Sequence, residues 1–548
     1  MSIEMEWLTV EPVCSLPEGC NDWGATNDGH VFATCPTADG RLVFVWDGVA
    51  GASFDRIAQL RDESQAAFAS PDGNHFAYVG IRGDRLFVGR DGIEDPPIED
   101  FTRSVPVTFD RRGTHVAYGA KLGGTFRLVL DGEPIGTGEL APIEAVFSDD
   151  GRRLAYVEIR DAGRDAQFRI VVDGQSGEWF SGMRNADGAM QFSPDGQRFA
   201  CYTIDGRGGA SWIVDGQRQR SINDTRPMSM ARVRGVGVVE PPLIAGFSPD
   251  GRRFAYFADV VEKGVAIVED DVPGPLFKAL LPFNFSPDSR HLAYAALTDH
   301  GTVAQVLDGA PIGEWPGRNA LRNIFSANSA HVVMMFEREE GGLFRKHSVF
   351  DVALDGQCLG EQLATDAGMD PTFSPDGNHV AWWARRRDDT VVAVVDGTAE
   401  ERPWSVNTQV QFDPAGRLVR GVQIDSKVAM VVGDRPGPQA DAGIPVFTID
   451  ELYGRTSAGA QLATYRIART GQVAWAGRFG DRVCPVLDDE VGPPFDSIHG
   501  CLVDDDAVSW WGQRDEQIFR IRRELAPPQA DGNRSSGTPA TTSTARAS

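Results

Sequence analysis

The sequence has no long apolar stretch, and none of its hydrophobic runs approaches the roughly 18 residues that a membrane span requires. The first ten residues, M-S-I-E-M-E-W-L-T-V, contain no basic region and no apolar core, so they do not read as a secretory signal. Cysteine is also scarce. The seven cysteines are scattered and form no C-x-x-C motif, which predicts neither a disulfide framework nor a zinc site. We therefore expect a soluble cytoplasmic protein with reduced thiols.

Basic residues are also fewer than acidic residues. The chain has 53 Lys and Arg against 78 Asp and Glu, a formal net charge of −25. Such a charge opposes any large electrostatic interface with nucleic acid or an anionic membrane, so we expect neither as a partner. Much of the acidity lies in recurring Asp-Gly dipeptides, and it is therefore partly a by-product of architecture.

What the sequence does contain is a repeat of 38 to 55 residues, present about twelve times. Its first landmark is F-S-P-D-G, which begins at Phe192, Phe247 and Phe373, with close variants in other units. Some 20 residues later each unit has an apolar stretch that ends in Asp-Gly, a strong signal for a tight β-hairpin turn. Residues 187–232, for example, divide into strands a, b, c and d, joined by S-P-D-G and V-D-G turns.

Four short strands in about 42 residues are typical of a β-propeller blade. Strand b supports this interpretation because its centre carries alanine in a fixed column, flanked by bulky apolar residues. A strand that is apolar on both faces is covered on both faces, and a small residue lets the next sheet approach closely. A β-solenoid would also stack its sheets, but its repeats are usually shorter. The alanine column comprises Ala77, Ala117, Ala155, Ala200, Ala255, Ala293 and Ala381.

The phrase F-S-P-D-G, followed by two polar residues and an apolar-Ala-aromatic run, resembles the WD-repeat-like repeat of the Tol translocation and prolyl-oligopeptidase-type propellers. The resemblance covers residues 21–525 and implies an all-β propeller, but it implies no activity because unrelated functions share this fold. The Tol protein is exported, and no signal is seen here. The oligopeptidases carry a hydrolase domain with a G-x-S-x-G motif, which this sequence lacks.

Twelve blades exceed the four to eight of an ordinary ring, so we expect two tandem propellers. The predicted domains are residues 1–272 and 273–525, followed by a polar, low-complexity tail at 526–548 that we expect to be disordered. An alternative boundary lies at the long insertion of residues 217–241. The last unit has no strand d of its own after Ile521, and we expect the N-terminal residues Glu6–Val10 to supply it.

No catalytic motif, cofactor fingerprint or metal-ligand spacing occurs in the sequence, so we expect no catalytic residue, no cofactor and no metal. Histidine recurs at one position ahead of strand b, where other units have arginine, and this repetition indicates a structural role. The acidic runs at 269–271 and 504–506 are interpreted as turns. The pairs Trp382-Trp383 and Trp510-Trp511 are interpreted as core residues that face two neighbouring blades.

Strand a of a propeller lines the central channel. Glu144, Arg322 and Asp370 lie near its expected mouth and are the candidate ligand-binding residues. The b–c and d–a connections share the end of the blades where length and sequence vary most, including residues 337–346. We therefore predict a non-catalytic scaffold that binds a protein or peptide through this face. The alternative is a small-ligand sensor or a lactonase-like, metal-dependent hydrolase that acts at the channel mouth.

Overall fold

The computed structural model describes residues 8–525, except 18–19, 21, 27, 58–66, 102–106, 137–140, 161–165, 184–188, 205–209, 220–224, 227–244, 261–263, 343–344, 360–369, 387–389, 402–404, 407–409 and 445–464. All secondary-structure elements in that part of the chain are β-strands, and it contains no helix that could cross a membrane.

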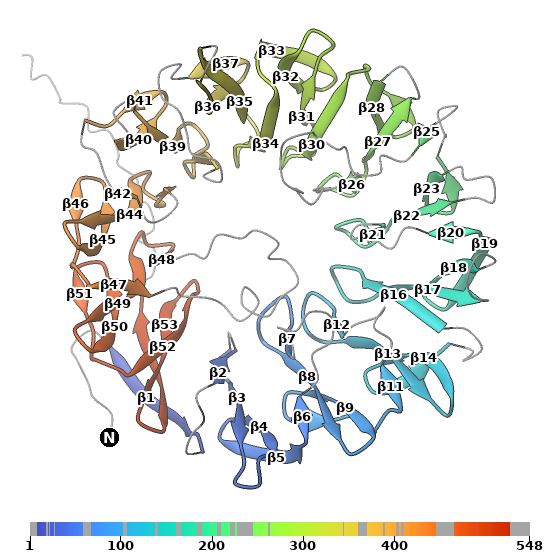
Figure 1. Cartoon of the computed structure of the whole chain (residues 1–548), viewed down its shortest axis with the longest axis vertical. Coiled ribbons are helices and arrows are strands. Elements are labelled where there is room, and N and C mark those ends of the chain that lie inside the picture. The colour runs from blue at the N-terminus through green and yellow to red at the C-terminus, as the bar shows by residue number, and fades with distance from the viewer. Residues whose placement is uncertain are drawn as a thin grey trace, which may run out of the picture.

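The strands form twelve antiparallel sheets, each with its own a, b, c and d positions, that follow one another around one ring (Figure 1). We number these sheets as blades 1 to 12, with strand a nearest the centre. The sequence-based prediction of an all-β propeller with twelve four-stranded blades is confirmed.

The first six blades contain the following strands: blade 1, β2 (Asp22–Ala25), β3 (Val31–Pro36), β4 (Leu42–Trp46) and β5 (Val49–Phe54); blade 2, β6 (Arg56–Ile57), β7 (Ala67–Ala69), β8 (Phe76–Arg82), β9 (Arg85–Arg90) and β10 (Ile93–Glu94); blade 3, β11 (Asp100–Phe101), β12 (Thr108–Phe109), β13 (Val116–Leu122), β14 (Thr125–Leu130) and β15 (Glu133–Ile135); blade 4, β16 (Ala141–Phe147), β17 (Leu154–Arg160), β18 (Gln167–Val172) and β19 (Gln175–Phe180); blade 5, β20 (Gly182–Met183), β21 (Met190–Phe192), β22 (Phe199–Ile204), β23 (Ala210–Val214) and β24 (Gln217–Arg218); blade 6, β25 (Thr225–Arg226), β26 (Ala245–Phe247), β27 (Phe254–Val260), β28 (Gly264–Glu269) and β29 (Val272–Pro273).

The other six blades contain these strands: blade 7, β30 (Ala279–Phe285), β31 (Leu292–Leu297), β32 (Thr302–Leu307) and β33 (Ala310–Pro316); blade 8, β34 (Asn319–Phe325), β35 (Val332–Gly342), β36 (Arg345–Leu354) and β37 (Gln357–Leu359); blade 9, β38 (Thr372–Phe373), β39 (Val380–Arg385), β40 (Val391–Val395) and β41 (Thr398–Ala399); blade 10, β42 (Ser405–Val406), β43 (Gln411–Phe412), β44 (Leu418–Ile424), β45 (Lys427–Val432) and β46 (Arg435–Pro436); blade 11, β47 (Ala442–Ile444), β48 (Tyr465–Ile467), β49 (Val473–Phe479), β50 (Arg482–Leu487) and β51 (Glu490–Val491); blade 12, β52 (Ser497–Val503), β53 (Ala507–Arg514), β54 (Gln517–Glu524) and β1 (Thr9–Ser15).

The alanine column of strand b explains how the blades stack. All seven alanines are fully buried. The next residue along strand b is often tyrosine, and it shares a core cluster with the alanine of the preceding blade, as Tyr118 does with Ala77 and Tyr294 with Ala255. The alanine leaves room for the aromatic ring of the neighbouring blade, so the predicted close approach of the sheets is confirmed.

Strand a is irregular at one fixed position. In blade 2 it is split between β6, whose Ile57 pairs with Gly80, and β7, whose Ala67 pairs with Tyr78. Five other blades are split in the same region, and blades 4, 7, 8 and 12 have a β-bulge there. Extra residues therefore enter the inner strand at one level while strand b stays continuous.

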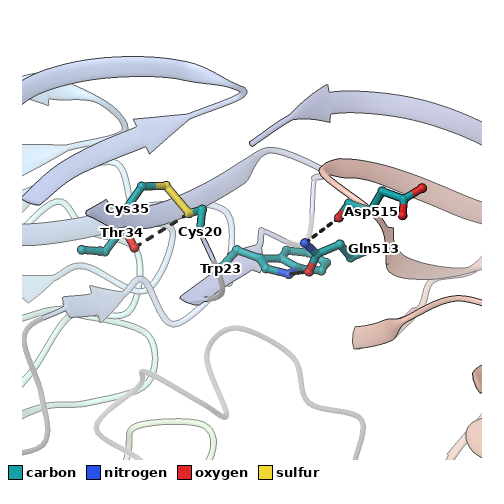
Figure 2. Close-up of a disulfide and its surroundings, with 6 residues drawn as sticks. All are labelled: Cys20, Trp23, Thr34, Cys35, Gln513 and Asp515. Carbon is teal, nitrogen blue, oxygen red and sulfur yellow. Dashed lines mark hydrogen bonds between the residues drawn. A yellow bond between two sulfur atoms is a disulfide. The ribbon is translucent and has the colours of Figure 1, made fainter. Parts of the chain in front are cut away.

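The N-terminus closes the ring. Strand β1 pairs with β54 and supplies strand d of blade 12, so the predicted closure by the N-terminus is confirmed. The strand is Thr9–Ser15 rather than Glu6–Val10, and residues 6 and 7 lie outside the described residues. Trp23 of blade 1 donates a hydrogen bond from Nε1 to Oε1 of Gln513 in blade 12 at 2.8 Å, which joins the two blades directly (Figure 2).

The expected division into two rings at residues 272/273 is replaced by one ring. Two closed rings would require blade 6 to pack against blade 1 and blade 7 against blade 12. Instead, Ile267 of blade 6 shares a core cluster with Tyr294 of blade 7, and Trp23 of blade 1 shares one with Ile518 of blade 12. Residues 1–272 and 273–525 thus form two arcs of the same ring (Figure 1). The tail at 526–548 lies outside the described residues.

A disulfide links Cys20 to Cys35 beside the closure (Figure 2). Cys20 precedes β2, whereas Cys35 lies on β3, and both side chains are buried. The expectation of reduced thiols is therefore wrong for this pair. A sequence separation of 15 forms no recognised motif, and the pair meets only because β2 and β3 are adjacent strands of one blade.

Candidate functional site

The c–d turns have the geometry that Asp-Gly predicts. In blade 3, Asp131 has φ 50° and Gly132 has φ 82°. Two consecutive positive φ angles define a type I′ turn, whose twist matches that of the flanking strands. The acidic run at 269–271 is such a turn in blade 6, with Asp270 at φ 44° and Asp271 at φ 67°.

The aspartate of this turn ties the c–d turn to the a–b turn. In blade 2, Oδ1 of Asp91 accepts a hydrogen bond from the backbone N–H of Phe76 at 2.9 Å, and Oδ2 accepts one from Nδ1 of His75 at 2.7 Å. The same His–Asp contact, at 2.6–2.7 Å, recurs in the pairs His30–Asp47, His115–Asp131, His291–Asp308, His331–Asp355 and His379–Asp396.

Arginine replaces histidine in blades 4, 5 and 6. Nε of Arg153 donates to Asp173, and Nε of Arg198 donates to Asp215, both at 2.8 Å, while Arg253 pairs with Glu269. Both residue types thus donate a nitrogen-bound hydrogen to a turn carboxylate. The structural role predicted for this column is confirmed.

One of these pairs gives a pH prediction. The hydrogen bond and charge of Asp396 raise the pKa of His379 above its ordinary value. A pKa raised by folding contributes stability that is fully present below the unfolded pKa and is lost as pH rises through the folded pKa. We expect the Tm difference between wild type and His379→Gln to shrink from pH 5.5 to pH 8. An NMR titration of the His379 ring should give a lower pKa in Asp396→Asn. An unchanged pKa in that variant would contradict the assignment.

The tryptophan pairs are core residues, as predicted. Trp382 and Trp383 are 1% and 2% exposed and belong to different core clusters, one shared with blade 8 and one with blade 10. Trp510 and Trp511 likewise divide between the clusters shared with blades 11 and 1. Neighbouring residues on a strand point to opposite faces, so each pair fastens one blade to both of its neighbours.

Metal-binding geometry is not seen in the described residues, where no three His, Cys, Asp or Glu side chains are grouped closely enough to hold an ion. In the run at 504–506, Oδ1 of Asp504 accepts hydrogen bonds from the backbone N–H groups of Asp506 and Ala507. That contact is typical of a turn, as predicted.

The three candidate ligand-binding residues lie on or just before the inner strands of three separate blades. Glu144 follows the β-bulge of β16 in blade 4, and Arg322 lies within the bulge of β34 in blade 8. Asp370 precedes β38 of blade 9. Three blades separate Glu144 from Arg322 (Figure 1), so the structure does not bring the three residues together. Ligand binding by any of them stays a prediction.

The b–c end of blade 8 differs from the predicted irregular loop. Residues 337–346 belong to a regular hairpin, in which β35 and β36 make ten cross-strand pairs, from Val333–Leu354 to Gly342–Arg345. The corresponding strands of blade 4 make six pairs. At about 3.4 Å per residue, the paired strands of blade 8 extend about 14 Å farther at the b–c end than those of blade 4.

The insertion at 217–241 contains two short strands. Residues 217–218 form β24, which is strand d of blade 5, and the strand d predicted within residues 187–232 is confirmed. Residues 225–226 form β25, the first part of strand a in blade 6. Residues 220–224 and 227–244 lie outside the described residues.

Polar groups between blades were not singled out by any sequence motif. Tyr118 of blade 3 donates a hydrogen bond to Oδ2 of Asp95 in blade 2 at 3.0 Å. Arg420 of blade 10, which is 1% exposed, pairs with Glu400 of blade 9 at 2.9 Å. In blade 4 the carboxylate of Glu158 is buried against Arg169. The sequence feature that could have identified Glu158 and Arg420 was a charged residue inside an otherwise apolar strand b.

Comparison with known proteins identifies no family for this chain. No family model matches the chain, and no curated protein matches it. Among solved structures, the β-propeller domain of the Trilobed protease from Pyrococcus furiosus, described as having an open velcro topology, is 12% identical with a TM-score of 0.24; the match covers 71% of this chain and 96% of that one. TolB from Acinetobacter baumannii is 13% identical with a TM-score of 0.21, over 55% and 79% of the two chains. Neither likeness carries information on activity or partners.

Proposed function

We propose that this chain is a non-catalytic scaffold that binds a protein or peptide partner through the face formed by its b–c and d–a connections. The observation that carries the proposal is the extended hairpin of β35 and β36. Its ten cross-strand pairs exceed the eight of β53 and β54 in blade 12 and the five or six between strands b and c of the other blades. A binding surface on a propeller needs elements that vary from blade to blade, held by a rigid framework.

The opposite end of the blades supports the proposal by contrast. Its turns are nearly uniform, and in blades 1 to 9 a His or Arg of the a–b turn pairs with an acidic residue of the c–d turn. Polar groups that already have partners offer fewer unsatisfied donors and acceptors to a second protein. The variable end is therefore the better candidate for recognition.

The test is a hairpin variant that leaves the blade intact. Arg338 pairs with Val349, so replacing residues 339–348 by Asn-Gly joins two paired residues through a turn of the preferred type. Proteins captured by the wild-type chain would be purified and titrated against both forms. We expect the shortened hairpin to weaken binding of a direct partner at least tenfold.

The matched control changes the other end. Arg152 and Arg290 lie on a–b turns with side chains that are 85% and 80% exposed. The double variant Arg152→Ala, Arg290→Ala should bind the partner as wild type does. If the shortened hairpin binds normally and the arginine variant does not, the working face has been assigned to the wrong end.

A further inference from the structure

A pocket of about 600 Å³ lies between blades 3 and 4, at the outer edge and toward the a–b and c–d turns, away from the proposed partner face. Blade 3 contributes Leu130, Ile135 and Gly136 to its wall. Blade 4 contributes residues of β17, β18 and β19. The volume is in the range of pockets that hold small organic ligands.

The polar part of this pocket is built from buried side chains. Glu158 is 4% exposed, and its Oε2 accepts hydrogen bonds from Nε and Nη2 of Arg169 at 2.7 and 2.6 Å. Tyr156 lies two residues earlier on the same face of β17 and is 5% exposed. One wall of the pocket thus carries a buried carboxylate and a tyrosine hydroxyl, which are polar groups of the kind that orient a ligand.

The Tyr156 hydroxyl makes no hydrogen bond in the part of the chain that the structure describes. Its counterpart Tyr118 donates to Asp95 of the preceding blade. Blade 3 offers Ile135 and Gly136 in that region instead. Burial, and then the charge of Glu158, raise the pKa of Tyr156, so its hydroxyl stays protonated and can donate. The hydroxyl does not belong to the fully buried polar atoms that lack a partner, so it is reachable from the pocket and available to a ligand there.

Gly136 keeps the polar groups open to the pocket. A Cβ at this position would lie 3.2 Å from the Tyr156 hydroxyl and 3.5 Å from Oε1 of Glu158. Any side chain at residue 136 would therefore cover both oxygens. Its φ of +82° is also one that side chains rarely adopt.

The charges around the pocket restrict the ligand. Three arginines and two carboxylates line the pocket. Glu158 pairs with Arg169, Arg153 pairs with Asp173, and Arg152 lies 3.7 Å from Asp150, so each charged group of the lining has a partner. A cationic ligand would meet the three arginines, and an anionic ligand would meet the two carboxylates. The class of ligand that remains is neutral and rich in hydroxyl groups. Its apolar C–H surface would face Leu130, Ile135 and Val171.

We propose that the pocket between blades 3 and 4 binds a small neutral polyol of monosaccharide size, with its hydroxyls on Tyr156 and Glu158. The ligand exchanges hydrogen bonds with the tyrosine hydroxyl and donates to Oε1 of the carboxylate. Its apolar face packs on the aliphatic wall. This site is independent of the proposed partner face.

Ligand-observed NMR and calorimetry on the full chain would test the proposal. The probes are glucose, galactose, mannose, N-acetylglucosamine and myo-inositol at up to 10 mM, with phosphate and putrescine as charged comparators. We expect at least one neutral probe to bind and neither charged comparator to bind. Binding of only a charged probe, or no binding of any neutral probe, would overturn the proposal.

Two variants locate the binding. Tyr156→Phe removes one hydroxyl and should weaken binding at least tenfold, and Ser176→Trp should block it by filling the pocket. Tyr294→Phe is the matched control, because Tyr294 occupies the same position of strand b in blade 7, outside the pocket. Equal affinity of Tyr156→Phe and Tyr294→Phe would place the ligand elsewhere and reject the assignment.

Discussion

Replacing Val10 by aspartate should release the N-terminal strand from the ring, whereas the same change at Val13 should leave the strand in place. Both residues lie on β1, but Val10 is 1% exposed and Val13 is 37% exposed. An aspartate at position 10 places an unpaired carboxylate in the cluster of Leu8, Ile498 and Ile521. We expect a loss of about 4 kcal/mol or more, a large part of the stability of an ordinary domain.

Thermal unfolding and limited proteolysis would measure this effect. The Val10→Asp variant should unfold at a lower temperature and be cleaved near its N-terminus first. Val13→Asp controls for the added charge on the same strand. Equal behaviour of the two variants would show that β1 does not hold the closure together.

A phenylalanine in place of Ala255 should destabilise the ring by about 3 kcal/mol, because an overpacked core forces neighbouring side chains and backbone to move. Ala255 of blade 6 is fully buried in a cluster with Tyr294 of blade 7. Urea unfolding would measure the change. Ala310→Phe, on the exposed start of β33, is the control and should change stability by less than about 0.5 kcal/mol.

A double variant makes this prediction specific. If the alanine exists to admit the tyrosine ring, Tyr294→Ala should partly relieve the cost of Ala255→Phe, since the two changes share one space. The free energies of unfolding of the two single variants should then not add. Strict additivity would show that the column has some other function.

The fold could be predicted from the sequence as far as the single blade. Asp-Gly turns, the alanine column and the paired tryptophans each depend on contacts within a blade or with its neighbour, and a local repeat encodes such contacts. The number of blades in a ring cannot be predicted from such local contacts. It depends on the small angle between successive sheets, summed over the ring, and no one residue determines it. The same sequence repeat was therefore compatible with two rings of six blades each.

The sites were harder to predict for a related reason. Glu144, Arg322 and Asp370 were chosen by their place on strand a, but whether such residues meet depends on the size of the ring. The pocket of Tyr156 and Glu158 is open because the preceding blade has no side chain at Gly136. Cys20 and Cys35 needed the pairing of β2 with β3 before their proximity could be recognised.

The fixed level at which strand a is interrupted has a consequence for how such a ring can diversify. Residues on both sides of the break keep their partners on strand b, so a segment added there leaves the stacking of the blades unchanged. In blades 2 and 11, residues 58–66 and 445–464, which lie outside the described residues, connect the two parts of strand a. Each blade with such a break or bulge thus offers an equivalent attachment point on its inner strand, and peptides grafted at several of them would be displayed together from one circular support.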